Sequence, residues 1–161
     1  MASAKKIFEQ VYQNVLRLHG RISNMLTGGQ KPTGFDELLH DAIKISSLAH
    51  YHSGDFRNAV LDGILAISDK IRARTGLDFD GDRLCSEAFS PRNPILVFSE
   101  IETESGKNDQ VGFIEILKGV YKGIRNPKAH SLDHDLDKFK AAQYLILISI
   151  LMRRVEDSKM P

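Results

Sequence analysis

Apolar residues recur at every third or fourth position in several long stretches of the chain, which is the spacing of one face of an α-helix. The most regular stretch follows Asp55, a residue type that favours the N-cap position of a helix. One face of this helix would consist of Phe56, Val60, Ile64, Ile67 and Ile71. Ala59 and Gly63 are small enough for a neighbouring helix to approach closely. The sequence therefore predicts that this helix is central.

Two stretches before it show the same spacing. The first is followed by Gly28 and Gly29, which should end the helix. Its apolar face contains Ile7, Val11, Val15, Leu18 and Ile22. The second should begin at Thr33, with Asp36 three residues later, and end near residues 50–54. Its buried stripe would contain Leu38, Leu39, Ala42, Ile45, Ser46 and Ala49.

Two more helices are predicted in the C-terminal half of the chain. Asn108 or Asp109 would cap the first of them, whose buried face contains Phe113, Leu117, Val120 and Ile124. Gly119 and Gly123 lie one turn apart on it and would permit a close helix contact or a dimer seam. Asp133 and Asp135 suit the start of the last helix, as N-cap and dipole partner. Its apolar positions include Leu136, Phe139, Ala142, Leu145 and Ile146.

Helical spacing fails between Thr75 and Gly106, where glycines and prolines accumulate. Within this segment, residues 84–89 could form a short buried helix, and residues 95–98 could form a strand or an extended core plug. We therefore expect an all-α bundle of about five helices with a long irregular crossover between the third helix and the fourth. Residues 1–161 should form a single domain, with 1–30 as an N-terminal helical extension that either covers the bundle, the favoured alternative, or binds a partner.

Composition limits the functions that such a chain can have. The net charge is only +1, so a bulk, non-specific DNA binder is not expected. The single cysteine, Cys85, excludes an internal disulfide and fits a small core residue. Because no apolar signal core or membrane-length apolar run is present, we expect a cytoplasmic protein that does not enter a membrane.

No metal or cofactor site is expected. His50 and His52 lie two positions apart, and on a helix this spacing places them on different faces. Asp78, Asp80 and Asp82 are similar in spacing to a calcium loop, but the glycine comes one position early and the position of the last ligand is not an acid. We therefore interpret this aspartate-rich segment as a turn.

The residues best suited to chemistry lie at the end of the fourth long helix. Arg125 should occupy its last turn, because Pro127 cannot donate the next backbone hydrogen bond and disfavours a helical Asn126. Such a bend would direct Arg125 and His130 into one cleft. A guanidinium matches phosphate oxygens, and an imidazole can exchange protons near neutral pH. Lys122 is a further candidate for contacts with a nucleic-acid backbone, as is Lys128.

The arginine, a polar residue after it and the histidine five positions on resemble the signature of the higher-eukaryotes-and-prokaryotes nucleotide-binding (HEPN) superfamily. Further stretches resemble its Ymh-type branch of uncharacterised prokaryotic proteins, and together they cover roughly positions 50–150. These stretches are His52–Val60, Gly81–Phe89, Gly112–Phe113 and Gly119–His130. The resemblance implies a helical domain that pairs with a second copy and places two motifs across a shared cleft. Some members cut RNA without metal, and others only bind nucleotides or partners.

We therefore expect a metal-independent endoribonuclease of a defence or toxin type, with Arg125, Asn126 and His130 as catalytic residues. Its partners would be a second copy, RNA and an antitoxin or regulatory protein. The alternative is a non-catalytic dimeric module that binds nucleotide or a protein partner. A purely structural interpretation also stays open, in which Arg125 binds helix-end carbonyls, Asn126 caps a turn and His130 satisfies a buried acceptor.

Overall fold

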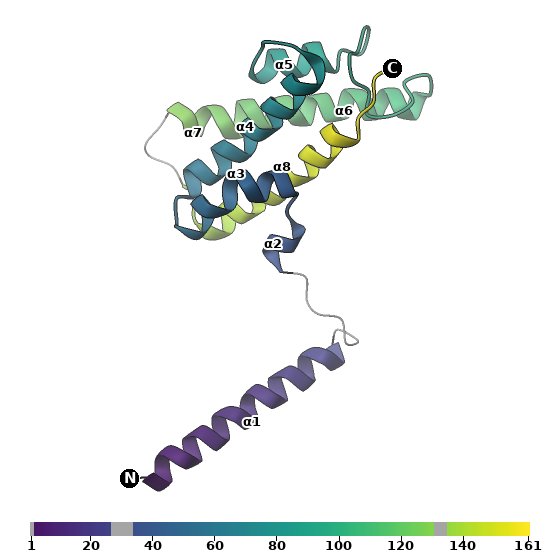
Figure 1. Cartoon of the computed structure of the whole chain (residues 1–161). Helices are drawn as coiled ribbons and strands as arrows, with labels where there is room; N and C mark the ends of the chain where they lie inside the picture. The colour runs from purple at the N-terminus through teal and green to yellow at the C-terminus, as the bar shows by residue number, and fades with distance from the viewer. Residues whose placement is uncertain (1, 27–33, 131–134) are drawn as a thin grey trace. The chain divides into compact units, whose positions relative to one another are not determined.

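The computed structural model describes residues 2–26, 34–130 and 135–161. It divides into two compact units, Met1–Gly34 and Phe35–Pro161. The first contains α1 (Ala2–Leu26). The second contains α2 (Phe35–Leu38), α3 (Asp41–His52), α4 (Phe56–Thr75), α5 (Gly81–Ala88), α6 (Glu104–Val120), the π-helical turn η1 (Tyr121–Arg125), α7 (Asn126–His130) and α8 (Lys138–Asp157). Across the described residues every named element is helical, which confirms the predicted all-α class (Figure 1).

The second unit is organised around α4, as the sequence predicts. This helix packs along α3 and α8 and also contacts α5, η1 and α7. Its buried positions are Ala59, Val60, Gly63, Ile64, Ile67, Ser68 and Ile71. A side chain at Gly63 would lie 3.0 Å from the Ser47 hydroxyl of α3 and 3.4 Å from Ile148 of α8. Glycine at this position therefore lets both neighbours pack directly against the backbone of α4.

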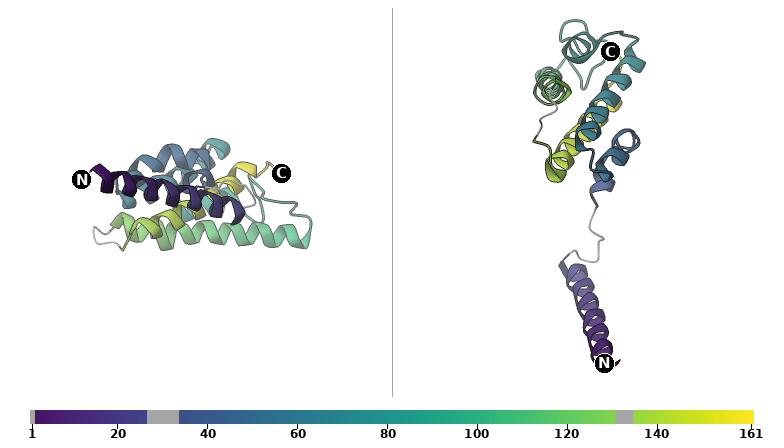
Figure 2. Two further views of the ribbon diagram at one scale, coloured as in Figure 1. Left: turned by 90° about the horizontal axis from the view of Figure 1, so that it is seen from below. Right: turned by 90° about the vertical axis from the view of Figure 1, so that its left-hand side faces the viewer.

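The ends of α4 are set by residues with matching local preferences. The Asp55 carboxylate accepts a hydrogen bond from the Asn58 amide at 3.4 Å, which confirms the predicted N-cap. Gly76 follows the last turn with φ of 71°, a left-handed conformation that glycine adopts without strain. Figures 1 and 2 show α4 and α8 running side by side, with α6 and α7 forming a separate rod beside them.

The second predicted helix is divided into α2 and α3, and part of its predicted buried stripe is wrong. His40 lies between the two helices, and its Nδ1 accepts a hydrogen bond from the Ala42 amide at 3.2 Å, so α3 begins at Asp41. The buried positions of α3 are Ile43, Ser47 and Tyr51. Ile45 falls on the opposite side and is 85% exposed. The predicted start at Thr33 lies outside the described residues.

Two other helix starts differ from the predicted ones. The Thr103 hydroxyl accepts from the Gly106 amide at 3.0 Å and caps α6, so neither Asn108 nor Asp109 is the cap. For α8 the cap is Asp137, which accepts from the Lys140 amide at 2.8 Å. In both cases another polar residue nearby satisfies the first amides of the helix: Thr103, which lies before Asn108 and Asp109, and Asp137, which lies after Asp135.

Asp135, one of the two candidates for the start of α8, instead forms an ion pair with the Lys140 side chain. Asp133 lies outside the described residues. Leu136 and Leu145 are buried as predicted, whereas Phe139 is exposed. The last helix is nevertheless central, since it packs against both α3 and α4.

The crossover between α4 and α6 contains the short buried helix α5 and then an extended core segment. Leu96 and Phe98 are buried in this segment, so residues 95–98 form the predicted plug rather than a strand. Buried Gln110 of α6 holds it by accepting from the Phe98 amide at 2.9 Å and donating to the Leu96 carbonyl at 3.1 Å. An isolated bridge then joins Val97 to Lys159.

Within the described ranges, no helix combines the length and the apolar character that crossing a bilayer would require.

Candidate functional site

The helix that carries the motif does not break at Pro127. It continues from α6 through the π-helical turn η1 into α7, and Asn126 is helical with φ of −64° and ψ of −49°. The Asn126 amide donates to the Tyr121 carbonyl, five residues earlier. A proline ring normally clashes with the carbonyl four residues before it, and the wider π turn is a means of relieving this clash. The predicted extended Asn126 and the predicted bend are therefore wrong.

Continuity of this helix changes how the motif residues are arranged within one chain. At about 100° per residue, positions 125 and 130 of a helix lie roughly 140° apart around its axis. Arg125 ends η1, and His130 is the last residue of α7. The His130 side chain lies outside the described part of the structure. The backbone of one chain therefore does not bend to bring these two positions into a common cleft.

Arg57 of α4 anchors the backbone that carries His130. Its Nε donates to the Lys128 carbonyl at 2.7 Å, and its Nη2 donates to the Ala129 carbonyl at 3.3 Å. These are carbonyls of the last turn of α7, which have no partner within so short a helix. Binding to helix-end carbonyls, considered for Arg125 from the sequence, is thus a role that Arg57 performs.

Arg125 lies beside a small cavity between α4, η1 and the start of α5. The cavity has a volume of about 160 Å³. It is lined by Leu61, Asp62, Ile64, Leu65, Ser68, Asp80, Tyr121, Arg125 and Ala129. The Arg125 side chain is 37% exposed, and its Nη2 lies 3.1 Å from Asp80 Oδ2. The guanidinium is thus accessible to solvent, and one of its edges is paired with a carboxylate.

Asp80 is held in place by groups other than Arg125. The Ser68 hydroxyl donates to Asp80 Oδ1 at 3.4 Å, and the Arg72 guanidinium lies 3.6 Å from the same oxygen. Asp80 directly precedes α5, whereas Ser68 and Arg72 belong to α4 and Arg125 to η1, so tertiary packing rather than local sequence brings this group together. Tyr121 completes it, with its hydroxyl 2.7 Å from the Ser68 hydroxyl.

Tyr121 forms the inner wall of the cavity. The residue is 2% exposed, and burial raises the pKa of its phenol above the ordinary value. It therefore acts as a neutral hydrogen-bonding group at physiological pH. The charged residues that line the cavity are Arg125, Asp62 and Asp80. The cavity thus has largely apolar walls, and its charged groups are one cation and two carboxylates.

The other predicted site residues lie in different surroundings. The Asn126 side-chain oxygen accepts from Arg125 Nη1 at 3.4 Å, so these two residues are in contact. Lys122 is 62% exposed in its side chain and lies 3.1 Å from Asp82 Oδ1. Lys128 is only 7% exposed, with its ammonium 5.3 Å from the centre of the Tyr144 ring. The structure brings Asn126 to Arg125 and places Lys128 in the packing against α8.

An exposed row of glycines runs along the same rod of helix. Gly112 and Gly119 of α6 and Gly123 of η1 are exposed, and an added methyl group at any of them would meet no atom within 4 Å. Ile116 lies between them at helical spacing and is 45% exposed. We call Gly112, Ile116, Gly119 and Gly123 the glycine face. The close helix contact predicted at Gly119 and Gly123 does not occur within the described part of this chain.

The two histidines two positions apart have different partners. His50 lies between two carboxylates, with Nδ1 3.1 Å from Asp55 and Nε2 3.3 Å from Asp62. His52 lies 3.3 Å from Asp36. Over residues 2–26, 34–130 and 135–161, no group of three or more metal-ligating side chains is placed to hold an ion.

Cys85 is fully buried, as predicted for a core residue, and burial raises the pKa of its thiol to about 12. A thiol with such a pKa is almost entirely protonated at neutral pH. Only the thiolate is an effective nucleophile, so this residue contributes packing rather than chemistry.

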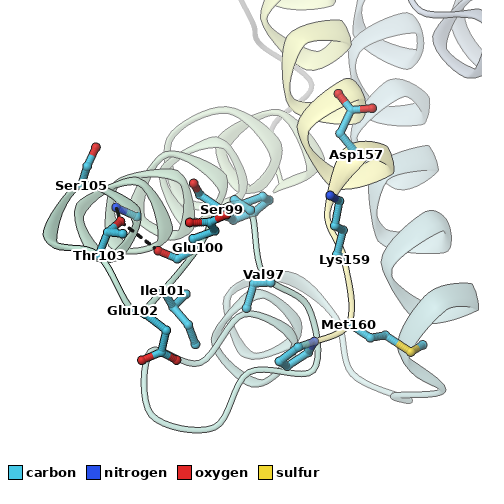
Figure 3. A pocket seen from close by; sticks show the side chains of 13 residues that line it. Val97, Ser99, Glu100, Ile101, Glu102, Thr103, Ser105, Asp157, Lys159 and Met160 are labelled. Atoms are coloured by element: carbon cyan, nitrogen blue, oxygen red, sulfur yellow. Dashed lines mark hydrogen bonds between the residues drawn. The ribbon is translucent and has the colours of Figure 1, made fainter.

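A second, larger hollow lies at the other end of α6, away from the motif in the chain. It has a volume of about 650 Å³ and lies between the loop before α6 and the C-terminal segment. Figure 3 shows the Val97, Ile101 and Met160 side chains around it, with Glu100 and Glu102 on the loop. The predicted site residues Arg125, Asn126, Lys122 and Lys128 do not line this hollow.

These features define a class of protein: an all-helical bundle with an accessible arginine at a π-helical turn, immediately before a short helix that ends in histidine. Over residues 37–155 the chain matches the family described as "Protein of unknown function (Hypoth_ymh)", and it belongs to this family. No curated protein and no solved structure matches the chain.

Proposed function

We propose that this protein is a metal-independent endoribonuclease of a defence or toxin type that acts in the cytoplasm. The observation that carries the proposal is the placement of Arg125. Its guanidinium is more than one-third exposed beside a small cavity, at a π turn that leads directly into the helix ending at His130. Such turns occur frequently at functional sites. The sequence resemblance to the HEPN superfamily supports the same assignment.

In the proposed reaction, the His130 imidazole accepts the proton of a ribose 2′-hydroxyl while this oxygen forms a bond to the adjacent phosphorus. Arg125 stabilises the negative charge that develops on the non-bridging oxygens. The bond between phosphorus and the 5′-oxygen breaks, and the leaving oxygen takes a proton from His130 of the partner subunit. The products are a 2′,3′-cyclic phosphate and a 5′-hydroxyl. DNA lacks the nucleophile and is not a substrate.

A second copy is part of this proposal because positions 125 and 130 do not lie on one side of the helix. The glycine face begins beside the motif and leaves the backbone of α6 and η1 open to a close neighbour. Small residues permit helices to approach closely, and a partner seated there would bring its own motif helix next to Arg125. Each cleft would then contain groups from both chains.

Two further residues take supporting roles in the proposal. Asn126, whose amide oxygen contacts Arg125, orients the guanidinium or the phosphate. Lys122 is exposed next to the motif and contacts the RNA backbone. Lys128 is buried, so we assign it no contact with substrate.

A second candidate function is a non-catalytic dimeric module that binds a nucleotide or a protein partner such as an antitoxin. The charge of the cavity favours this candidate, because Asp62 and Asp80 repel a phosphate that approaches Arg125. The same two carboxylates would instead attract a cationic group of a partner protein.

Incubation of RNA with the protein in the presence of a chelator tests the proposal. We expect cleavage that leaves 2′,3′-cyclic phosphate ends and that falls at least about 100-fold in Arg125→Ala and in His130→Ala. Arg92→Ala and His52→Ala remove the same residue types at exposed positions outside the motif and should retain activity. If the protein does not cleave RNA but binds a nucleotide tightly, it is the binding module rather than a ribonuclease.

A further inference from the structure

The α1 helix carries a heptad pattern. If Phe8 is assigned to position a, the a positions are Phe8, Val15 and Ile22, and the d positions are Val11, Leu18 and Met25. All six residues lie within α1 and are apolar. Within the first unit, the described residues contain no second helix that could cover Val11, Val15, Leu18 and Ile22. An isolated helix that exposes such a stripe is only marginally stable in water, so the pattern indicates a helical partner.

We infer that α1 pairs with α1 of a second copy as a parallel, two-stranded coiled coil. The side chains in the middle of the stripe favour this arrangement. The β-branched residues Val15 and Ile22 occupy two of the three a positions and Leu18 the d position between them, whereas Phe8, Val11 and Met25 do not follow the pattern. β-Branched residues at a with leucine at d favour parallel dimers over trimers and tetramers. We call the a and d residues of α1 the seam. The seam of one copy can pack against the identical seam of another, so a second copy supplies a matching surface.

The residues that flank the seam are compatible with parallel pairing. In such a coil, each g position faces the next e position of the partner. These facing pairs would be Ile7 with Tyr12, Asn14 with His19, and Arg21 with Leu26. None of them brings two like-charged side chains together. The charged residues Glu9 and Arg17 occupy the outer positions b and c, where water surrounds them.

The area of the seam indicates a weak association. A fully buried aliphatic side chain removes roughly 60–120 Å² of apolar surface from water. In the two copies together, Val11, Val15, Leu18 and Ile22 would therefore bury about 500–1,000 Å², whereas specific, stable interfaces bury about 1,200–2,000 Å² in total. The expected dimer is stable at high protein concentration and dissociates on dilution.

This interface is separate from the glycine face and independent of the proposed ribonuclease activity. Loss of activity in Arg125→Ala says nothing about α1. Conversely, a failure of α1 to pair leaves the chemistry of the motif unaffected, although pairing would raise the effective concentration of one bundle near another.

Two leucine substitutions in the full chain test the inference. Leu16 and Leu18 are both exposed on α1, but Leu16 falls at the outer position b, whereas Leu18 falls at d. Sedimentation equilibrium should show that Leu18→Glu raises the dimer dissociation constant at least about tenfold, the equivalent of 1.4 kcal/mol, while Leu16→Glu leaves it nearly unchanged. Equal effects of the two variants, or a monomeric wild-type protein at all concentrations, would overturn the inference.

A cross-linking experiment tests whether the two α1 helices are parallel. In a parallel coil the two copies of Val11 face each other across the seam, so Val11→Cys should form a symmetric disulfide under mild oxidation. The native Cys85 is buried and does not interfere. A dimer that forms without this cross-link would contradict the parallel register. A wild-type monomer that instead sediments with vesicles of anionic lipid would assign the apolar stripe to a membrane surface.

Discussion

The guanidinium of Arg125 lies 3.1 Å from the carboxylate of Asp80, a residue 45 positions earlier in the chain. The same carboxylate is contacted by Ser68 and Arg72, so Asp80 is fixed by the bundle rather than by Arg125 alone. This pair holds the predicted catalytic arginine at the edge of the cavity. It also offers Arg125 a negative partner that an RNA phosphate would have to replace.

Replacement of Asp80 by asparagine should therefore strengthen RNA binding. The amide keeps the shape of the side chain but removes the charge that competes with phosphate for Arg125. Because the pair is partly exposed, we expect a gain of about 0.2–1 kcal/mol, or up to fivefold in affinity. Fluorescence anisotropy with a labelled RNA in a chelator would measure it. Asp78→Asn, at an exposed position outside the cavity, is the matched control, and equal effects of both variants would exclude a local role for Asp80.

Arg57 should be a positioning residue for the motif. Its two hydrogen bonds hold the last turn of α7, and their loss leaves the carbonyls of Lys128 and Ala129 without this donor. We expect Arg57→Ala to lower the free energy of unfolding by about 1–3 kcal/mol, measured by urea denaturation. The same variant should lower kcat of RNA cleavage more than it changes KM.

Arg57→Lys distinguishes positioning from loss of charge. A lysine keeps the cation but cannot supply the fork of donors that Arg57 uses. Only partial recovery of kcat is therefore expected. Full activity in Arg57→Ala under conditions where the protein is folded would show that the motif does not depend on this anchor.

Substitutions at Gly119 test whether the glycine face forms the interface between two copies of the chain. An added side chain meets nothing within 4 Å in the chain, so Gly119→Ala should be neutral or stabilising by up to about 1 kcal/mol. Gly119→Leu should fold equally well but hold a second copy away, with at least a tenfold loss of cleavage activity. Thermal unfolding and RNA cleavage, measured on both variants, separate folding from assembly. Full activity in a folded Gly119→Leu protein would exclude this face as that interface.

Stability at low pH should depend on Glu156. Hydrogen bonds and charge from Lys70, and then from His40, lower the pKa of this carboxyl from 4.5 to about 2. A depressed pKa in the folded state means that the stabilisation is present above pH 4.5 and is lost as the pH falls towards 2. Because Glu156 is 47% exposed, its contribution should be less than about 1 kcal/mol.

Urea denaturation at neutral pH and at pH near 2 measures this contribution. The Glu156→Gln variant should be slightly less stable than the wild type at neutral pH, and the difference should vanish in acid. Glu87→Gln, at an exposed position on α5, provides the control. A difference that persists unchanged at low pH would show that Glu156 stabilises the fold by packing rather than by its charge.

The sequence predicts the central part of the fold well because periodicity and capping act locally. Asp55 and the stripe from Phe56 to Ile71 specify α4, and the structure confirms both. The residues before α3 show the limit of this reasoning. An N-cap at His40 sets the phase of that helix, and Ile45, which fits a stripe counted from Thr33, lies on the exposed side instead.

The candidate site was only partly predictable. Arg125 and Asn126 could be identified from their residue types and spacing, but the π turn could not, since the local rules for Pro127 predict a break. Asp80, Tyr121 and Arg57 reach the site through contacts between elements distant in sequence, which spacing does not reveal. Asp80 stands in the aspartate-rich segment 78–82 and Arg57 close to the N-cap Asp55, so nothing in the sequence around them links either residue to the motif.

The most direct test of the proposed chemistry uses an oligodeoxynucleotide that contains one ribonucleotide, incubated with the protein in the presence of a chelator. The reaction through a 2′-hydroxyl predicts a single cut directly after the ribose, with a 2′,3′-cyclic phosphate on one product and a 5′-hydroxyl on the other, and no cut by His130→Ala. Cleavage at deoxyribose positions, or an equal rate in His130→Ala, would contradict the account.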